Sequence, residues 1–198
     1  MGLFRTNYKK NSDEELMLYL GKGDKRAFDE LYLRYADNLC YFFMRKLKHD
    51  REKGEDFVHD VFAKLIERPE LFDVTRTFKT WIYSVANNMC KNEYKKMEVR
   101  SNTSNGLDNS YNVSMNELSA TEVMHNEQFK EALAHSLNQM DEKHKEVFEL
   151  RFFQELSIKE IAEVMEINDG TVKSRLFYAT KRLSESLAIF DPNLNREV

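Results

Sequence analysis

Cationic side chains gather near the end of the chain, and no Asp or Glu separates them: Lys173, Arg175, Lys181 and Arg182. Lys and Arg on one helix can hold DNA phosphates, while side chains at the beginning of that helix read base edges in the major groove. Residues 157–183, SIKEIAEVMEINDGTVKSRLFYATKRL, therefore predict a helix-turn-helix whose second helix contacts DNA. An ordinary amphipathic helical hairpin with a solvated charged face is the alternative interpretation.

Local signals favour this pair of helices. A Ser followed three positions later by Glu forms a capping box, so Ser157 and Glu160 predict the start of the first helix. Residues 166–170 predict the turn, and Thr171 is expected to cap the second helix. The residues expected to form the buried inner face are Ile161, Ala162, Met165, Val172 and Leu176.

The composition of the whole chain predicts long helices. The chain has 198 residues, enough for one sizeable core or two small ones, with 2 Pro, 6 Gly and almost no strand-like alternation. The formal net charge of −4 does not exclude DNA binding, because the charges are unevenly distributed. Residues 101–127 contain no Lys or Arg, and their acidic side chains are Asp108, Glu117, Glu122 and Glu127. We therefore expect one part that faces DNA and another surface for a different partner.

Neither a metal centre nor a cofactor is predicted. Cys40 and Cys90 lie far apart in helical patterns, which is typical of core cysteines in a reducing compartment. His59-Asp60 resembles the HD pair of metal phosphohydrolases, but the further His and Asp ligands of such a site are not identifiable. No hydrophobic run reaches membrane-spanning length and no secretory signal is present, so we expect a cytoplasmic protein without membrane insertion.

The N-terminal part predicts a separate helical body. Ser12 and Glu15 form another capping box, which opens its first helix. A helix expected over residues 55–67 gathers its apolar residues on one broad stripe. Asp56 and Asp60 lie four positions apart and share a face beside that stripe. Two carboxylates on one rigid helix can form charge-assisted pairs with Arg side chains of a partner.

A loop, a long helix and a linker follow this acidic helix. Pro69 is expected to end it, residues 71–77 to form the loop, and residues 77–96 to form an aromatic-rich helix. Trp81 lies among the apolar residues of that helix, so we expect it in the core rather than stacked on a base. Residues 101–116 are rich in Asn and Ser and poor in large apolar side chains, which predicts a linker.

The predicted fold class is all-α, with two small helical domains joined by a flexible acidic and polar linker and a C-terminal helix-turn-helix. The expected boundaries are an N-terminal tail over 1–11, a first domain over 12–98, a linker over 99–121, a second domain over 122–190 and a C-terminal tail over 191–198.

Two separated motifs carry a resemblance to a known family. One is EDFVHDVFAKLIERPELFD followed by TFKTWIYSVANNMCKNEYKK, residues 55–73 and 77–96, and the other is GTVKSRLFYATKRL, residues 170–183. In this order and spacing the chain resembles the extracytoplasmic-function group of the sigma-70 family of bacterial RNA polymerase sigma factors. The resemblance implies a sigma factor, not an enzyme, that binds core RNA polymerase and directs promoter recognition, DNA melting and transcription initiation.

In this family the helix matching residues 55–67 docks on the coiled coil of the largest polymerase subunit. The resemblance implies that the polymerase-binding residues are Asp56, Phe57, Asp60, Val61 and Lys64. The family's promoter-melting element matches the loop and the helix that follow. The implied residues for the minus-ten element are Asp73, Thr75, Arg76, Asn87, Asn88, Lys91, Asn92 and Lys95. The first three of these are the candidates for capturing a flipped base, and the Asn side chains can read base edges.

The second helix of the helix-turn-helix matches the family's recognition helix for the minus-thirty-five element. The implied residues are Ser157, Thr171, Lys173, Ser174, Arg175, Phe177, Tyr178 and Lys181. Lys173, Ser174 and Phe177 would face bases, whereas Arg175 and Lys181 would hold phosphate.

The recognition segment departs from the family pattern at several positions. Family members commonly carry Arg or Lys where this chain has Tyr178 and Thr180, and fewer phosphate contacts predict weaker autonomous DNA binding. Glu166 stands where a glycine is frequent, which predicts a turn strained by about 1 kcal/mol or less.

The resemblance also implies the partners of the chain. These are the largest and second-largest subunits of core RNA polymerase, promoter DNA, and an anti-sigma factor or another regulatory protein. A sigma factor delivered to DNA by a separate targeting partner, even an RNA-guided one, stays an alternative. A helix-turn-helix regulator with a ligand-sensing N-terminal domain is another, which the polymerase-docking motif disfavours. The linker is expected to lie in a basic polymerase channel or to act as an inert tether.

Overall fold

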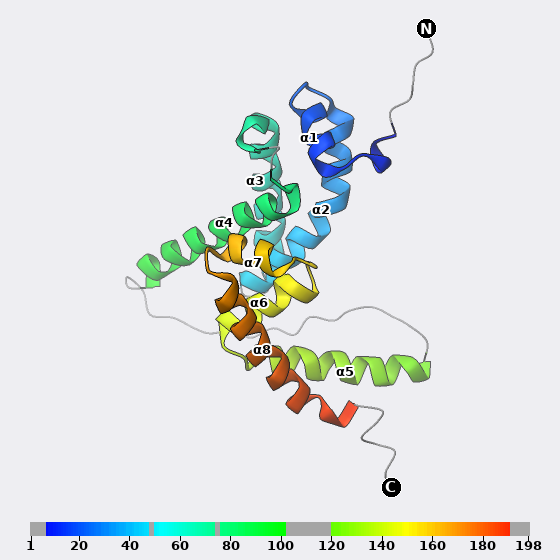
Figure 1. Cartoon of the computed structure of the whole chain (residues 1–198), viewed down its shortest axis with the longest axis vertical. Helices are drawn as coiled ribbons and strands as arrows, with labels where there is room; N and C mark the ends of the chain where they lie inside the picture. The colour runs from blue at the N-terminus through cyan, green and yellow to red at the C-terminus, as the bar shows by residue number, and fades with distance from the viewer. Residues whose placement is uncertain (1–6, 48–49, 74–75, 102–119, 191–198) are drawn as a thin grey trace. The chain divides into compact units, whose positions relative to one another are not determined.

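The computed structural model describes residues 7–47, 50–73, 76–101 and 120–190, and every regular element in these ranges is a helix. The chain divides into two compact units, residues 1–113 and 114–198, which are described separately below. Figure 1 shows the helices of each unit along the chain. Most of the predicted linker, and all of the predicted C-terminal tail, lie outside the described residues. The predicted all-α class is confirmed.

Unit 1 contains four α-helices and two short 3₁₀ turns within its described residues. They are η1 (Tyr8–Lys10), α1 (Asp13–Leu20), α2 (Lys25–Lys46), α3 (Arg51–Glu67), η2 (Pro69–Leu71) and α4 (Phe78–Ser101). The predicted capping box opens α1: Ser12 Oγ accepts the Glu15 N–H and Glu15 Oε2 accepts the Ser12 N–H. Asp24 caps α2 without a reciprocal bond: Asp24 Oδ1 accepts the Arg26 N–H at 3.0 Å.

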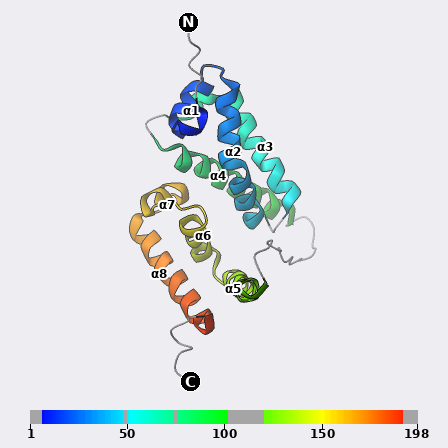
Figure 2. The ribbon, with the colours of Figure 1, turned by 90° about the vertical axis from the view of Figure 1, so that its right-hand side faces the viewer.

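Helices α2 and α3 lie side by side and form most of the core of unit 1 (Figure 2). Aromatic rings fill their interface, with ring centroids 4.8 Å apart for Tyr32 and Phe62 and 5.2 Å apart for Phe43 and Phe57. Leu31, Leu39 and Leu65 are fully buried between them. Burial of this many apolar side chains supplies the main driving force for the unit.

Helix α3 begins at Arg51, four residues earlier than the sequence predicts. Asp50 caps it by accepting the Lys53 N–H at 3.0 Å, so the charged segment before Glu55 continues the helix. Gly54 is buried at a close approach to α2: a Cβ atom there would lie 3.0 Å from Met44 Cγ and 3.3 Å from the Cys40 carbonyl oxygen. Gly54 therefore allows α2 and α3 to approach closely, and it does not interrupt helix α3.

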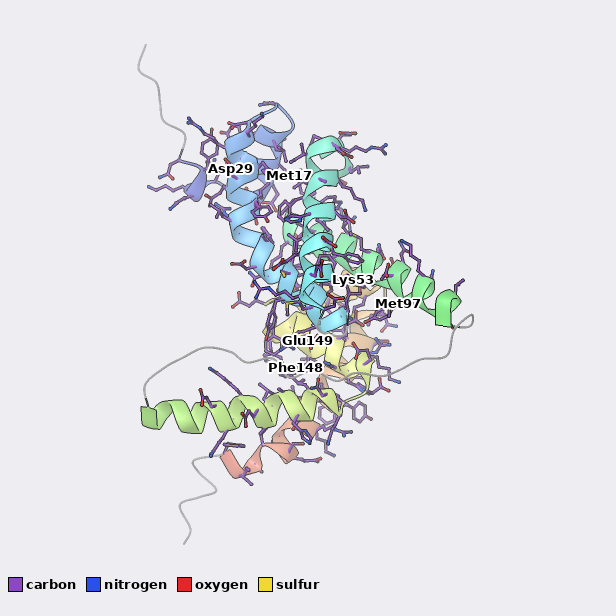
Figure 3. The ribbon with its side chains drawn as sticks, turned by 180° about the vertical axis from the view of Figure 1, so that it is seen from behind. Met17, Asp29, Lys53, Met97, Phe148 and Glu149 are labelled. Atoms are coloured by element: carbon purple, nitrogen blue, oxygen red, sulfur yellow. The ribbon has the colours of Figure 1, made fainter. Side chains whose placement is uncertain are left out.

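Helix α4 packs on α1, α2 and α3 through its inner stripe, which contains Phe78, Ile82, Tyr83, Ala86 and Cys90. It is longer than the predicted 77–96, because no Gly or Pro interrupts residues 97–101. Its far end is tied to α3, where Lys53 Nζ lies 2.7 Å from the buried carboxylate of Glu93 (Lys53 is labelled in Figure 3). It is also tied to α2, where the Tyr94 hydroxyl donates to the Lys46 carbonyl.

The segment before α1 is attached to α2 through the guanidinium group of Arg34 and through a hydrogen bond to the N-cap residue of that helix. Arg34 donates to the carbonyl oxygens of Tyr8, Lys9 and Asn11 at 3.0–3.3 Å. The Tyr8 hydroxyl donates to Asp24 Oδ2 at 2.7 Å. Packing in this unit thus includes residues that the sequence places in the N-terminal tail.

Unit 2 contains α5 (Ala120–Asn138), α6 (Glu142–Phe152), α7 (Ile158–Met165), α8 (Asp169–Ser186) and η3 (Ala188–Phe190). One apolar cluster joins α5, α6 and α8 and consists of Leu137, Met140, Phe148, Ala179 and Leu183. A second group of buried residues holds α7 against α6 and α8, and its members are Leu150, Leu156, Ile161, Val164 and Val172. Val164 also belongs to this inner face, although it is not among the residues predicted for it.

The turn between α7 and α8 follows the prediction in outline and differs in its cap. Glu166 adopts the left-handed conformation, with φ 60° and ψ 44°, which a glycine would adopt at lower cost. The cap of α8 is Asn168, not Thr171 as predicted, because Asn168 Oδ1 accepts the Thr171 N–H at 2.7 Å. Helix α8 therefore begins at Asp169, inside the predicted turn.

The close approach of α2 and α3 gives a stability prediction. Gly54→Val should lower the free energy of unfolding by about 1–3 kcal/mol, because the added atoms have no room beside Met44 and Cys40. Ala63→Val, on the exposed face of α3, should cost only the small propensity difference of a β-branched residue, below about 1 kcal/mol. Urea unfolding followed by circular dichroism measures both. Equal losses in the two variants would contradict the close contact.

Candidate polymerase and nucleic-acid interfaces

The outer face of α3 carries the predicted acidic pair. Asp56 and Asp60 are both exposed and lie one helical turn apart, and Lys64 is exposed one turn further on. Phe57 is half-buried at the edge of this face, where its ring packs edge-on against Phe43 at 5.2 Å. Val61 is only 1% exposed, so its predicted role in contacting polymerase is wrong for this conformation. It points into the core of unit 1 because it shares the helical phase of the buried stripe.

The outer face of α4 presents Asn88, Asn92 and Lys95, which are exposed on one side of the helix, and Lys91, which is half-buried beside them. Asn87 is 3% exposed and lies on the buried side, so it cannot reach DNA as predicted. Consecutive helical residues are about 100° apart, and this rotation places Asn87 inward and Asn88 outward.

The segment before α4 contains the predicted base-capturing residues. Asp73 and Arg76 are exposed, and the Arg76 N–H donates to the Asp73 carbonyl at 3.0 Å. Thr75 lies outside the described residues. Trp81 is half-buried, with its ring 5.6 Å from that of Phe72 and 5.8 Å from that of Phe78. It belongs to the rim of the core, in agreement with the core interpretation.

The exposed side of α8 carries most of the predicted upstream-reading residues. Lys173, Ser174, Phe177, Tyr178 and Lys181 are exposed, and Phe177 remains 61% exposed despite its large ring. Arg175 and Thr171 are half-buried. Ser157 is exposed at the start of α7, where it forms the predicted capping box with Glu160. An exposed helix with cations and an apolar ring has the side chains needed for phosphate and thymine-methyl contacts.

Tyr178 and Thr180, the two positions of α8 that depart from the family pattern, contact other residues of unit 2. The Tyr178 ring lies 5.9 Å from His144 of α6 and 5.6 Å from Phe177. The Thr180 hydroxyl donates back to the carbonyl oxygens of Leu176 and Phe177, at 2.9 Å and 3.1 Å. Neither side chain carries the positive charge of a Lys or Arg, and weaker autonomous DNA binding stays a prediction.

The described residues offer no sign of metal or thiol chemistry. No group of three or more His, Cys, Asp or Glu side chains lies together in these ranges. Both cysteines are free thiols; burial and the nearby Glu55 carboxylate raise the pKa of Cys40, which is the opposite of nucleophile activation. Burial also raises the pKa of Tyr35 and of Tyr83 far above the usual range, so both hydroxyls stay protonated. No described helix is both long and apolar enough to cross a membrane.

Comparisons with known proteins match both units. The family described as Sigma-70 region 2 matches residues 31–99, and the family described as Sigma-70, region 4 matches residues 130–183. The RNA polymerase sigma-H factor of Pseudomonas aeruginosa is 27% identical over 186 residues, which cover 90% of this chain and 95% of the relative. The ECF RNA polymerase sigma factor SigW of Bacillus subtilis is 24% identical over 172 residues, which cover 84% of this chain and 91% of the relative.

A solved structure shares the fold. The sigma factor RpoE of Bartonella quintana, crystallised with the anti-sigma factor NepR, aligns with a TM-score of 0.66 and 22% identity, over 82% of this chain and 97% of that one. The two family matches together span more than half of the chain, in the order that the sequence motifs predict. The chain belongs to the extracytoplasmic-function group of the sigma-70 family.

Proposed function

We propose that this chain is a sigma factor that binds core RNA polymerase through unit 1 and directs transcription initiation at specific promoters. One observation carries the proposal: matches to region 2 and region 4 of the sigma-70 family lie in order on two separate helical units. The chain supplies binding surfaces and no catalytic residue, because nucleotide addition belongs to the polymerase. It acts in the cytoplasm, where core polymerase and chromosomal DNA are found.

Polymerase docking uses the outer face of α3. The carboxylates of Asp56 and Asp60 form charge-assisted pairs with Arg side chains of the largest subunit, and the half-buried ring of Phe57 adds apolar contact at the edge. Lys64 lies at the end of the same face. Val61 supports this surface from the core and does not touch the partner.

Promoter melting uses α4 and the residues just before it. Bases that leave the duplex must be held by polar side chains beside cations that contact the backbone. Asn88 and Asn92 offer amide groups to base edges, and Lys91 and Lys95 lie beside them to hold phosphate. Asp73 and Arg76 lie exposed before the start of α4, where a flipped base can be captured. Thr75 remains a candidate for the same role.

Recognition of the upstream element uses α8. Lys173, Ser174 and Phe177 meet base edges, and Arg175 and Lys181 hold phosphate, with Ser157 and Thr171 at the helix starts. Tyr178 and Thr180 add no positive charge to this helix, whose cations are Lys173, Arg175, Lys181 and Arg182. Stable binding to the upstream element therefore depends on attachment to polymerase.

The same two positions favour a second candidate mode of delivery. A sigma factor that makes few contacts to DNA phosphates can be brought to its promoter by a separate targeting protein. The tether to that protein raises the effective concentration of the sigma factor at the promoter. A regulatory partner of the anti-sigma type is a further proposal, supported by the Bartonella quintana relative, whose solved structure includes an anti-sigma factor.

Co-purification with core polymerase separates a sigma factor from a helix-turn-helix regulator. A sigma factor forms a stoichiometric complex with polymerase that lacks sigma, whereas a regulator has no need of one. Gel filtration of the mixed proteins tests for this complex. Denaturing gel electrophoresis of the co-eluting fractions then gives the ratio of this chain to the polymerase subunits. Separate elution of this chain and core polymerase would overturn the proposal.

Reversing one charge on α3 tests the docking surface. Asp60→Lys should weaken core-polymerase binding by about 2 kcal/mol or more, because a carboxylate that meets Arg becomes a cation. The fold should be unaffected, since Asp60 is exposed. Asp29→Lys, at another exposed acidic position on α2, is the matched control and should bind normally. Fluorescence titration measures both affinities, and unchanged binding by Asp60→Lys would remove the docking assignment.

Two neighbouring asparagines give opposite expectations. Asn88→Ala should weaken binding of the holoenzyme to a minus-ten oligonucleotide by about 1–3 kcal/mol and leave the thermal unfolding temperature unchanged. Asn87→Ala should instead lower the stability of unit 1 by about 1–3 kcal/mol, because it removes a buried polar group from its partners. The oligonucleotide affinity of the holoenzyme and the calorimetric stability of the free chain are measured for both variants. Lower stability in Asn88→Ala together with weaker binding but normal stability in Asn87→Ala would contradict the assigned faces.

Substitutions on α8 separate base reading from phosphate binding. Lys173→Ala or Ser174→Ala should change the upstream base preference by about 1–3 kcal/mol for each lost base contact. Lys181→Ala should weaken all promoters alike and reduce the salt dependence of binding. Holoenzyme binding to a library of upstream sequences at two salt concentrations measures these effects. Uniform weakening by all three variants would show that Lys173 and Ser174 do not read bases.

A further inference from the structure

A carboxylate of α1 meets the beginning of α4, although the two residues are far apart in the chain. The Phe78 N–H donates to Glu14 Oε1 at 2.9 Å, across a separation of 64 residues. Phe78 is the first residue of α4. The first N–H groups of a helix have no partner within that helix, and a negative charge is favourable at this end of the helix dipole. Glu14 thus caps α4 from another helix.

The rest of the junction is built around the same residue of α4. The Phe78 ring is fully buried, and it packs 5.2 Å from the Tyr35 ring and 5.4 Å from the Phe72 ring. The Tyr35 hydroxyl donates to Asp13, the neighbour of Glu14, and Asp13 also pairs with Arg34 at 2.7 Å. The two adjacent carboxylates of α1 are therefore bound to α2 on one side and to α4 on the other.

This junction controls where the exposed promoter-melting residues lie. Phe72 comes directly before Asp73, and Phe78 comes two residues after Arg76. The contact between the Phe72 and Phe78 rings fixes both ends of the connection that holds these two side chains. The direction of α4 is fixed at the same point, because its first N–H group is bonded to α1.

We propose that Glu14 is a positioning residue for promoter melting, because its carboxylate fixes the start of α4 and thereby places Asp73, Arg76 and the outer face of α4 against the displaced strand. This inference rests on the proposed sigma-factor function. Glu14 itself touches no DNA in this arrangement.

The ionisation of Glu14 agrees with this role. Burial alone would raise its pKa, but the hydrogen bonds, chiefly that from the Phe78 N–H, lower the pKa below its usual value. A lowered pKa in the folded state means that the carboxylate stabilises unit 1 above the unfolded-state pKa, and that this contribution is lost as the pH falls through the folded-state value. The anionic cap is therefore fully present at neutral pH.

The test compares Glu14→Ala and Glu14→Gln with Glu15→Ala in the reconstituted holoenzyme. Glu15→Ala is the matched control, because it removes the neighbouring carboxylate, which caps α1 through the Ser12 N–H and is not the partner of the Phe78 N–H. Permanganate reactivity of unpaired thymines measures the rate of open-complex formation. The rate is compared on a duplex promoter and on the same promoter with a pre-opened minus-ten bubble. Binding to core polymerase and thermal unfolding are measured for every variant.

Glu14→Ala should slow the opening of the duplex promoter by about tenfold, the effect of one lost charged helix cap. Glu14→Gln keeps an oxygen acceptor for the Phe78 N–H but loses the negative charge, so its opening rate on duplex should lie between those of Glu14→Ala and the wild-type protein. The bubble template should remove the difference from the wild-type protein, and Glu15→Ala should open duplex at the wild-type rate.

Several results would overturn the inference. They are a wild-type opening rate for Glu14→Ala, an equal loss on duplex and bubble templates, or an equal loss in Glu15→Ala. If Glu14→Ala fails to fold, Glu14→Gln decides instead: a slower rate restricted to duplex supports the inference, and a wild-type rate on duplex overturns it. Failure of the wild-type chain to bind core polymerase would count against the proposed function itself, and core binding is scored separately for that reason.

Discussion

Burial of one apolar stripe on α4 decides which of its polar residues face the solvent. Phe78, Ile82, Tyr83, Ala86 and Cys90 lie against the neighbouring helices of unit 1, so the described side chains on the opposite side of α4 are accessible to a partner. Asn88, Asn92 and Lys95 lie on that opposite side. The same constraint acts on α3, whose buried stripe leaves Asp56 and Asp60 outside, and on α8, whose buried residues leave the Lys173 face outside. Function in this chain depends on helical phase, which core packing sets.

The proposed interfaces lie on three helices of one chain. The carboxylates proposed to meet polymerase lie on α3, whereas the cations proposed to meet DNA lie on α4 and α8, so the two kinds of contact use different helices. A net charge of −4 is compatible with DNA binding for this reason. Joining modest contacts in one polypeptide raises the effective concentration of the second contact once the first has formed. Sequence-specific binding by the assembled polymerase therefore requires less from α8 than binding by an isolated domain would.

Local signals were predictable from the sequence, and contacts between distant residues were not. The capping boxes at Ser12 and Ser157 need only two residues three positions apart, so both were found. Asn87 and Val61 were misplaced because a family motif gives residue types and leaves their helical phase open. The start of α3 was missed because Gly54 suggests a break unless the nearby α2 backbone is known. The Glu14–Phe78 contact spans 64 residues and leaves no local sequence signal.

Promoter choice is the property that this chain is proposed to give to core RNA polymerase. Transcription of genomic DNA by purified core polymerase, with and without the chain, tests this proposal when the 5′ ends of all transcripts are mapped. We expect a defined set of new start sites that appear only when the chain is present and that share sequence elements near minus ten and minus thirty-five. An identical pattern of start sites with and without the chain would contradict it.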